Sequence, residues 1–349
     1  MIYGNGALMY TPNEKRYDKT EYRRCGKSGL KMSALSLGLW KNFGSKSPFD
    51  NMEKMVHTAF DCGICCFDLA NCYGSPDNGA AEENFGRILD KGLRAYRDEL
   101  CISTKAGFYM WSGPYGDKNG SAKNLTASLD GSLKRMGLEY VDIFYHHIAD
   151  PDTPAEETAL ALDKAVKDGK ALYVGISNYD GRQTEEIASI FRELHTPFIV
   201  NQLPFSVLDR ESEEVLRVND DIGIGTAVFS PLYQGFLSDR YLNGIPADSR
   251  VGKGETWVGE ELDDKMISKL RQLNCIAQAR GQSLSQMALA WILSHKEVTT
   301  VIIGASCPEQ ITENARCTEK PDFSEEELLQ IDMIISVSYT HLRAHETAA

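Results

Sequence analysis

The sequence lacks the glycine-rich patterns by which many proteins hold nucleotide phosphates. Its 349 residues contain neither G-x-G-x-x-G nor the G-x-x-x-x-G-K-[ST] pattern of P-loop proteins. A doubly wound open sheet that binds a dinucleotide is expected to carry such a fingerprint after its first strand. That fold is therefore disfavoured.

Long apolar runs and an excess of positive charge are also missing. No apolar stretch reaches the roughly 20 residues that cross a bilayer, and the first 24 residues are polar, without a signal-peptide core. The formal net charge of -13 argues against nucleic-acid or anionic-membrane partners. We therefore expect a cytoplasmic protein that binds any anionic ligand through a local group of Lys, Arg and backbone N–H groups.

The nine cysteines lack the spacing of a zinc site. Cys62, Cys65, Cys66 and Cys72 cluster, but Cys65 and Cys66 should point to opposite faces of a strand. No second knuckle appears at a recognisable spacing. We expect no metal site, and buried, reduced thiols in place of disulfides.

What the sequence does contain is an alternation of apolar and helical segments. Eight apolar segments begin near residues 34, 64, 100, 141, 171, 198, 223 and 301, and helical patterns follow them. Their near-continuous apolar character is typical of strands covered on both faces. We predict an α/β fold, a (β/α)₈ TIM barrel, with a short N-terminal hairpin from Tyr22 to Met32. The expected units are a polar arm over 1–21 and one domain over 22–336.

Chemically useful side chains stand at the ends of successive predicted strands. Asp68 closes the second strand, Tyr73 follows five residues later, Lys105 closes the third, and His146 and His147 close the fourth. Each has a bland alternative, such as a helix cap, a loop aromatic or a satisfied core histidine. In a barrel, however, the carboxyl ends of all strands face one common site. We therefore predict that these side chains converge.

From Tyr22 to about Ile335, the chain resembles the aldo-keto reductases. Within that family it is similar to the bacterial reductases of L-glyceraldehyde 3-phosphate and to potassium-channel β subunits. The motifs that carry the resemblance are Phe67-Asp68 with Tyr73-Gly74, Ser103-Thr104-Lys105, Asp142 leading to His147, Gly175-Ile176-Ser177-Asn178, Asn201-Gln202 and Glu313-Asn314.

The resemblance implies an NADPH-dependent carbonyl reductase with four catalytic residues. Tyr73 would donate a proton to the substrate oxygen, and Lys105 would lower the Tyr73 pKa from its usual value near 10. Asp68 would hold Lys105 charged and in place. The family's histidine stands five residues after Asp142, which selects His147 over His146 to orient the carbonyl.

The resemblance also implies the cofactor contacts. Besides Asp68, the matching positions are Ser177, Asn178 and Gln202 for the nicotinamide amide, Trp40 and Phe229 for the nicotinamide ring, Ser230, Leu232 and Gly235 for the pyrophosphate, Arg240 and Arg250 for the phosphates, and Gly304, Ser306, Gln310, Glu313 and Asn314 for the adenosine 2′-phosphate and adenine.

Two features depart from the family pattern. Many reductases carry Arg where this chain has Gln310, and without an arginine fork the 2′-phosphate is held less strongly. NADPH remains the expected cofactor, with NADH second. Residues 337–349 have no counterpart in the family, and we expect there a truncated reading frame or cloning scar.

We therefore predict reduction of small aldehydes, of the L-glyceraldehyde 3-phosphate or methylglyoxal class, to alcohols. The alternative is a cofactor-binding regulatory subunit of a membrane channel with vestigial reductase activity, since the same four residues fit both. The sequence leaves open whether the protein forms a homo-oligomer.

Overall fold

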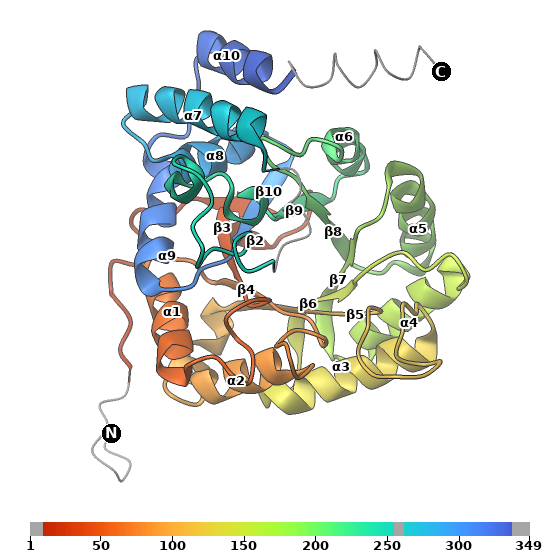
Figure 1. The fold of residues 1–349 in the computed structure, drawn as a ribbon. Coiled ribbons are helices and arrows are strands. Elements are labelled where there is room, and N and C mark those ends of the chain that lie inside the picture. Colours follow the sequence, from red (N-terminus) through yellow and green to blue (C-terminus); the bar gives the residue numbers. More distant parts are fainter. Residues whose placement is uncertain (1–9, 255–261, 337–349) are drawn as a thin grey trace.

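Eight parallel strands form a closed barrel (Figure 1). The computed structural model describes residues 10–254 and 262–336. Because β10 pairs with β3 through Val301 and Leu35, the barrel has no edge strand, and the predicted fold is confirmed. The barrel strands are β3 (Leu35–Gly38), β4 (Cys66–Asp68), β5 (Cys101–Ala106), β6 (Val141–His146), β7 (Ala171–Ser177), β8 (Phe198–Pro204), β9 (Gly225–Phe229) and β10 (Val298–Ile303).

Helices surround the barrel and cover the outer faces of its strands (Figure 1). Two of them, α7 and α8, follow each other along the chain between β9 and β10. The helices are α1 (Phe49–Asp61), α2 (Ala80–Leu89), α3 (Ala122–Met136), α4 (Ala155–Lys167), α5 (Gly181–Leu194), α6 (Glu213–Ile222), α7 (Asp264–Ala279), α8 (Leu284–Leu293), α9 (Pro308–Ala315) and α10 (Glu325–Ser336). Short 3₁₀ turns are η1 (Leu93–Glu99), η2 (Tyr233–Gly235), η3 (Asp239–Tyr241) and η5 (Arg316–Glu319).

The predicted hairpin is present, with β1 (Tyr22–Arg24) pairing antiparallel to β2 (Lys31–Ser33). The chain before it packs on α1, where the Tyr10 ring stacks on His57 with the ring centroids 3.7 Å apart. The Tyr10 hydroxyl donates to Asp61 at 2.8 Å. The first nine residues of the expected arm, and the expected tail over 337–349, lie outside the described residues.

Local signals place the helix ends, and apolar packing joins the helices to the barrel. Ser283 and Gln286 form a capping box at the start of α8, and α3 ends at Gly137 in the left-handed conformation that glycine favours. Between the layers, the Phe67 ring of β4 packs on the Phe85 ring of α2, with centroids 5.3 Å apart. The strand ends are thereby fixed relative to the loops that follow them.

The remaining sequence expectations concern membranes, thiols and metals. No helix in the described ranges has both the length and the apolar character needed to cross a membrane. All nine cysteines are free thiols. Within residues 10–254 and 262–336, no three His, Cys, Asp or Glu side chains gather in a way that could hold a metal ion.

Candidate active site

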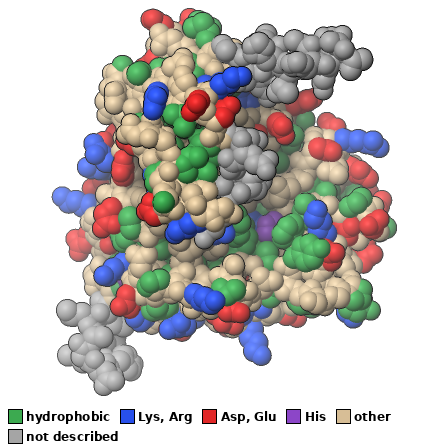
Figure 2. Space-filling model, viewed as in Figure 1, with side chains coloured by type: hydrophobic (Ala, Val, Ile, Leu, Met, Phe, Trp, Pro, Cys, Tyr) green, Lys and Arg blue, Asp and Glu red, His purple; other side chains and the backbone are tan. Residues whose placement is uncertain are grey.

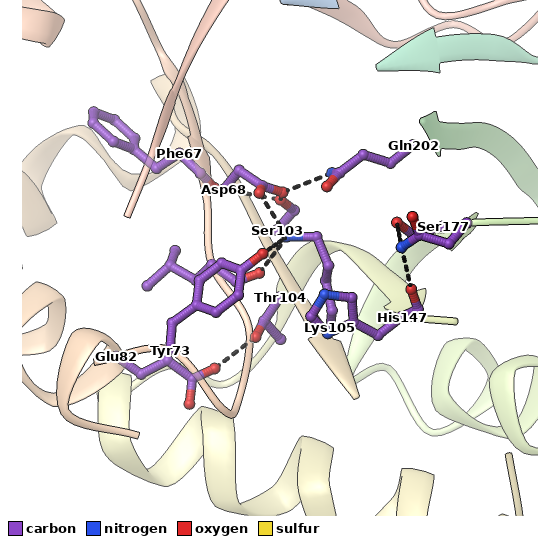
Figure 3. Close-up of polar contacts among 12 residues, drawn as sticks. Phe67, Asp68, Tyr73, Glu82, Ser103, Thr104, Lys105, His147, Ser177 and Gln202 are labelled. Atoms are coloured by element: carbon purple, nitrogen blue, oxygen red, sulfur yellow. Dashed lines mark hydrogen bonds and ion pairs between the residues drawn. The ribbon is translucent and has the colours of Figure 1, made fainter. Parts of the chain in front are cut away.

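An ion pair between Lys105 and Asp68 occupies the carboxyl end of the barrel. The Lys105 ammonium donates to Asp68 Oδ2 at 2.5 Å and to the Leu69 carbonyl at 2.8 Å. It also donates to the Tyr73 hydroxyl at 3.4 Å (Figure 3). Asp68 ends β4, Lys105 lies in β5, and Tyr73 lies in the loop that leads to α2. Three of the four predicted catalytic residues therefore meet.

The second oxygen of Asp68 has its own partners. Oδ1 accepts from Ser103 Oγ at 2.9 Å and from Gln202 Nε2 at 3.0 Å (Figure 3). Lys105 is fully buried and Asp68 nearly so. Buried charges persist only where they are paired and hydrogen-bonded, and this pair meets both conditions. Burial lowers the pKa of Lys105, and the Asp68 carboxylate counters that effect.

The expectation that the pKa of Tyr73 lies below its usual value near 10 is wrong in this structure. Burial raises the pKa of Tyr73 well above its usual value, and the Asp68 carboxylate raises it further. The Lys105 ammonium, 3.4 Å from the hydroxyl and itself paired with Asp68, does not offset these two effects. Tyr73 therefore keeps its proton at neutral pH.

His147 completes the predicted group of four. Its ring lies 5.8 Å from the Tyr73 ring and 5.3 Å from the Phe108 ring, centroid to centroid. Its buried Nδ1 has no hydrogen-bond partner among the described residues. Burial and the nearby Lys105 hold the pKa of His147 well below 6.5, so the ring is neutral.

His146, the competing histidine, is engaged elsewhere. Its side chain is fully buried, and its Nδ1 lies 2.6 Å from the Tyr179 hydroxyl. A Cβ on Gly107 would come within 2.7 Å of the His146 ring, which shows how closely the loop after β5 covers it. The geometry therefore brings His147, and not His146, to Tyr73.

The residues predicted to hold the nicotinamide amide lie at the ends of β7 and β8. Gln202 contacts Asp68, as described above, and Asn178 Nδ2 donates to the His147 carbonyl at 3.0 Å and to Ser177 Oγ at 3.1 Å. Asn178 has a φ of +57°, a left-handed conformation that is uncommon for a residue other than glycine. The end of β8 is thus tied to the ion pair, and the end of β7 is tied to the backbone of His147.

The loop predicted to surround the pyrophosphate begins at Phe229, the last residue of β9. Ser230 and Gln234 have φ values of +54° and +58°. Such conformations cluster at ligand-binding sites because the surrounding structure must hold them. The Gly235 amide donates to the Leu232 carbonyl at 2.8 Å, so this N–H is already used within the loop.

The two predicted phosphate-binding arginines follow this loop. Arg240 forms an ion pair with Asp248 at 2.7 Å, and both side chains are exposed. Arg250 is partly buried. Trp40, which was predicted to contact the nicotinamide ring, follows β3, the first strand of the barrel. Its side chain is 47% exposed, and the Lys41 ammonium lies 4.8 Å from its ring centroid.

The predicted adenosine segment runs from the end of β10 into α9. Gln310 Oε1 accepts from the Ser306 amide at 2.8 Å and from the Ser306 hydroxyl at 3.2 Å. Gly304 is exposed, Asn314 is buried, and the Glu313 carbonyl accepts from Gln286 at 3.0 Å. The neutral Ser306–Gln310 pair stands where the family pattern has an arginine.

The centre of this face is hollowed, and a histidine side chain is visible inside the hollow (Figure 2). The loop after β5 carries exposed aromatic side chains, of which Tyr109 is 56% and Trp111 43% exposed. Asn78, from the loop that carries Tyr73, donates to the Met110 carbonyl at 2.8 Å. The two loops therefore hold each other in place.

Sequence reasoning overlooked one buried carboxylate near this site. Glu82 of α2 is fully buried and bonded to Thr104 of β5 (Figure 3). An acid in the first turn of a helix ordinarily indicates a solvated position that favours the helix dipole. A signal was nevertheless present, because Glu82 shares a helix face with Phe85 and Leu89, three and seven residues on.

The buried His146 makes stability depend on pH. Burial lowers its pKa to about 4, against 6.5 for an exposed histidine. Between these two values the unfolded chain binds a proton that the folded chain does not, so stability falls as pH drops from 6.5 to 4. We expect His146→Asn to remove up to about 1.4 kcal/mol per pH unit from that slope. Urea unfolding across this range measures it, and identical slopes for the two proteins would contradict the assignment.

Comparison with known proteins agrees with this geometry. Residues 34–336 match the pattern of the Aldo/keto reductase family. The chain is 50% identical over 335 residues to the L-glyceraldehyde 3-phosphate reductase of Escherichia coli (strain K12), with 94% of this chain and 96% of that protein covered. The protein of the same name from Escherichia coli O157:H7 matches equally well. The chain therefore belongs to the aldo/keto reductase family, whose members are oxidoreductases that use a nicotinamide cofactor.

Proposed function

We propose that this protein reduces small aldehydes to alcohols with NADPH, and that Tyr73 is the general acid. The observation that carries the proposal is the contact of Lys105 with both Asp68 and Tyr73, beside a neutral His147. We propose three-carbon aldehydes, including glyceraldehyde 3-phosphate and methylglyoxal, as the substrates. The 50% identity to a reductase of L-glyceraldehyde 3-phosphate supports that class.

The polar side chains at this end of the barrel fit a nicotinamide cofactor. Gln202 presents a carboxamide beside Asp68, and Asn178 presents one beside His147. Amide groups of this kind pair with a nicotinamide carboxamide. The aromatic rings of Trp40 and Phe229 are at least partly exposed at the same end of the barrel. Arg240 and Arg250 follow β9 and would hold the phosphates.

The proposed reaction needs a hydride and a proton. The reduced nicotinamide supplies the hydride when it is bound. Tyr73 holds the proton on its hydroxyl, and its raised pKa means that the whole population is protonated at neutral pH. The transfer is still downhill, because an alkoxide is a stronger base than a phenolate.

Lys105, His147 and Asp68 support the proton transfer from Tyr73. Lys105, 3.4 Å from the hydroxyl, stabilises the phenolate that remains when the proton has left. His147 is neutral and can hydrogen-bond the substrate carbonyl, which orients it toward Tyr73. Asp68 keeps Lys105 in place through its 2.5 Å contact.

The substrate class can be tested with a panel of carbonyl compounds. Asn78 ties the loop that carries Tyr73 to the loop that carries Trp111, which limits how far the two loops can separate around a substrate. We therefore expect three-carbon aldehydes to have a higher kcat/KM than hexoses and steroids. NADPH consumption, followed by absorbance, measures the ranking. A bulky ketone in first place would contradict the proposed class, and tight NADPH binding without turnover of any aldehyde would favour the regulatory-subunit alternative.

The role of Tyr73 can be tested by removing its hydroxyl alone. We expect Tyr73→Phe to lower turnover by roughly 10² to 10⁴-fold, the range of general acid catalysis. NADPH affinity should persist, because most proposed cofactor contacts come from later strands. Lys105→Met should also reduce turnover strongly, since it leaves Asp68 without its partner. The double variant should lose less than the product of the two effects, because both act on one proton transfer. Near-normal turnover in Tyr73→Phe, or fully independent losses, would contradict this role.

The cofactor preference depends on the neutral pair at α9. We expect NADPH to bind about tenfold more tightly than NADH, or about 1.4 kcal/mol. Gln310→Arg should widen that ratio, because a guanidinium fork suits a phosphate. Gln278→Arg is the matched control, since it adds the same charge at an exposed position of α7, outside the predicted cofactor segments. Fluorescence titrations give both affinities, and equal binding of the two cofactors would overturn the preference.

A further inference from the structure

A second buried ion pair lies directly behind the first. Glu82, in the first turn of α2, has a fully buried side chain. Its Oε1 accepts from Thr104 Oγ1 at 2.5 Å, and its Oε2 contacts Arg135 Nε of α3 at 2.7 Å. Both oxygens of the carboxylate are therefore used, one by the barrel and one by a neighbouring helix.

The Glu82 carboxylate is connected through a few residues to Lys105 on one side and to Tyr73 on the other. On the barrel side, Thr104 directly precedes Lys105 in β5, and successive strand residues point to opposite faces. On the helix side, the Tyr73 carbonyl accepts from the amides of Gly79 at 3.0 Å and Ala81 at 3.3 Å, one residue before Glu82. Glu82 thus bonds the segment that carries Tyr73 to the strand that carries Lys105 (Figure 3).

Arg135 leaves little room for that segment to move. A Cβ on Gly79 would lie 2.8 Å from Arg135 Cδ and 3.0 Å from Arg135 Nε. A Cβ on Gly86, one turn after Glu82 in α2, would lie 2.8 Å from the Arg135 carbonyl. The two glycines allow α2 to approach Arg135 closely, and the ion pair with Glu82 fixes that approach.

We propose that Glu82 is a positioning residue that holds the Tyr73 hydroxyl within reach of Lys105 through its bonds to Thr104 and Arg135. The proposal rests on the proposed role of Tyr73 as the acid. The 3.4 Å contact between Lys105 and Tyr73 is the longest bond in the group, so it has the least margin for displacement. A small shift of α2 would break it while leaving the Asp68 pair intact.

The first test changes the acceptor and the donor of the Glu82–Thr104 hydrogen bond separately. Glu82→Gln presents an amide N–H to Thr104 or to Arg135, both of which are donors. Thr104→Val keeps the β-branched shape and removes the hydroxyl. We expect each variant to lower kcat, by up to the order of 10²-fold that a misplacement of about 1 Å can cause. KM for the aldehyde and NADPH affinity should stay within about threefold. Thr104→Ser, which retains the hydroxyl, should restore most of kcat.

A matched pair elsewhere separates positioning from stability. Asp163 of α4 is also a buried carboxylate that accepts from a threonine, Thr196, at 2.8 Å, and it pairs with Lys167 at 2.6 Å. It lies near the start of β8, away from the strand ends that carry the site. Asp163→Asn and Thr196→Val should lower the melting temperature without changing kcat of the folded enzyme. If Glu82→Gln behaves in the same way, Glu82 is only structural and the proposal is wrong.

The second test asks whether Glu82 acts through Tyr73. We expect Glu82→Gln to have little effect on the residual rate of a Tyr73→Phe enzyme, because the hydroxyl that it positions is absent. An undiminished loss in that background would overturn the inference and leave the role of Tyr73 standing. Near-normal turnover in Tyr73→Phe itself would instead reject the proposed function on which the inference rests.

Discussion

The buried ion pair of Lys105 and Asp68 is the constraint on which this end of the barrel depends. A lysine without solvent contact stays in a fold only where its charge is compensated. Breaking such a pair by removing one partner typically costs about 3–5 kcal/mol, because the remaining charge is left buried alone. Ser103 and Gln202 donate hydrogen bonds to the second oxygen of Asp68, and the Leu69 carbonyl accepts one from Lys105. Each therefore serves the fold and the site together.

The closed parallel sheet is what brings the two charges together. Asp68 pairs in register with Ser103 of the next strand, and Lys105 lies two residues further along that strand. Gln202 comes from four strands further around the ring and still reaches Asp68. In an open sheet these strand ends would spread along a line. Closure turns them toward one axis, so residues distant in sequence share one carboxylate.

The barrel, its hairpin and the meeting of Asp68, Tyr73, Lys105 and His147 could all be predicted from the sequence. Strand ends and residue order were sufficient to bring Asp68, Tyr73, Lys105 and a histidine to one end of the barrel. The family resemblance selected His147 over His146. The direction of the Tyr73 pKa was not predictable in this way. It depends on how deeply the phenol is buried and on how close the Asp68 carboxylate lies to it, and only the folded structure decides both. The burial of Glu82 was missed for a related reason, since a helix-start acid is usually solvated.

The charges of this site balance before any substrate arrives. Lys105 pairs with Asp68 and Arg135 with Glu82, while the raised pKa of Tyr73 and the lowered pKa of His147 leave both of these rings neutral. In the proposed reaction, the negative charge that develops on the substrate oxygen therefore appears in a buried region whose charged side chains are already paired. It develops beside a phenol that can release a proton and an ammonium that can stabilise the resulting phenolate. Such preorganised groups act strongly because they need no rearrangement when the charge appears.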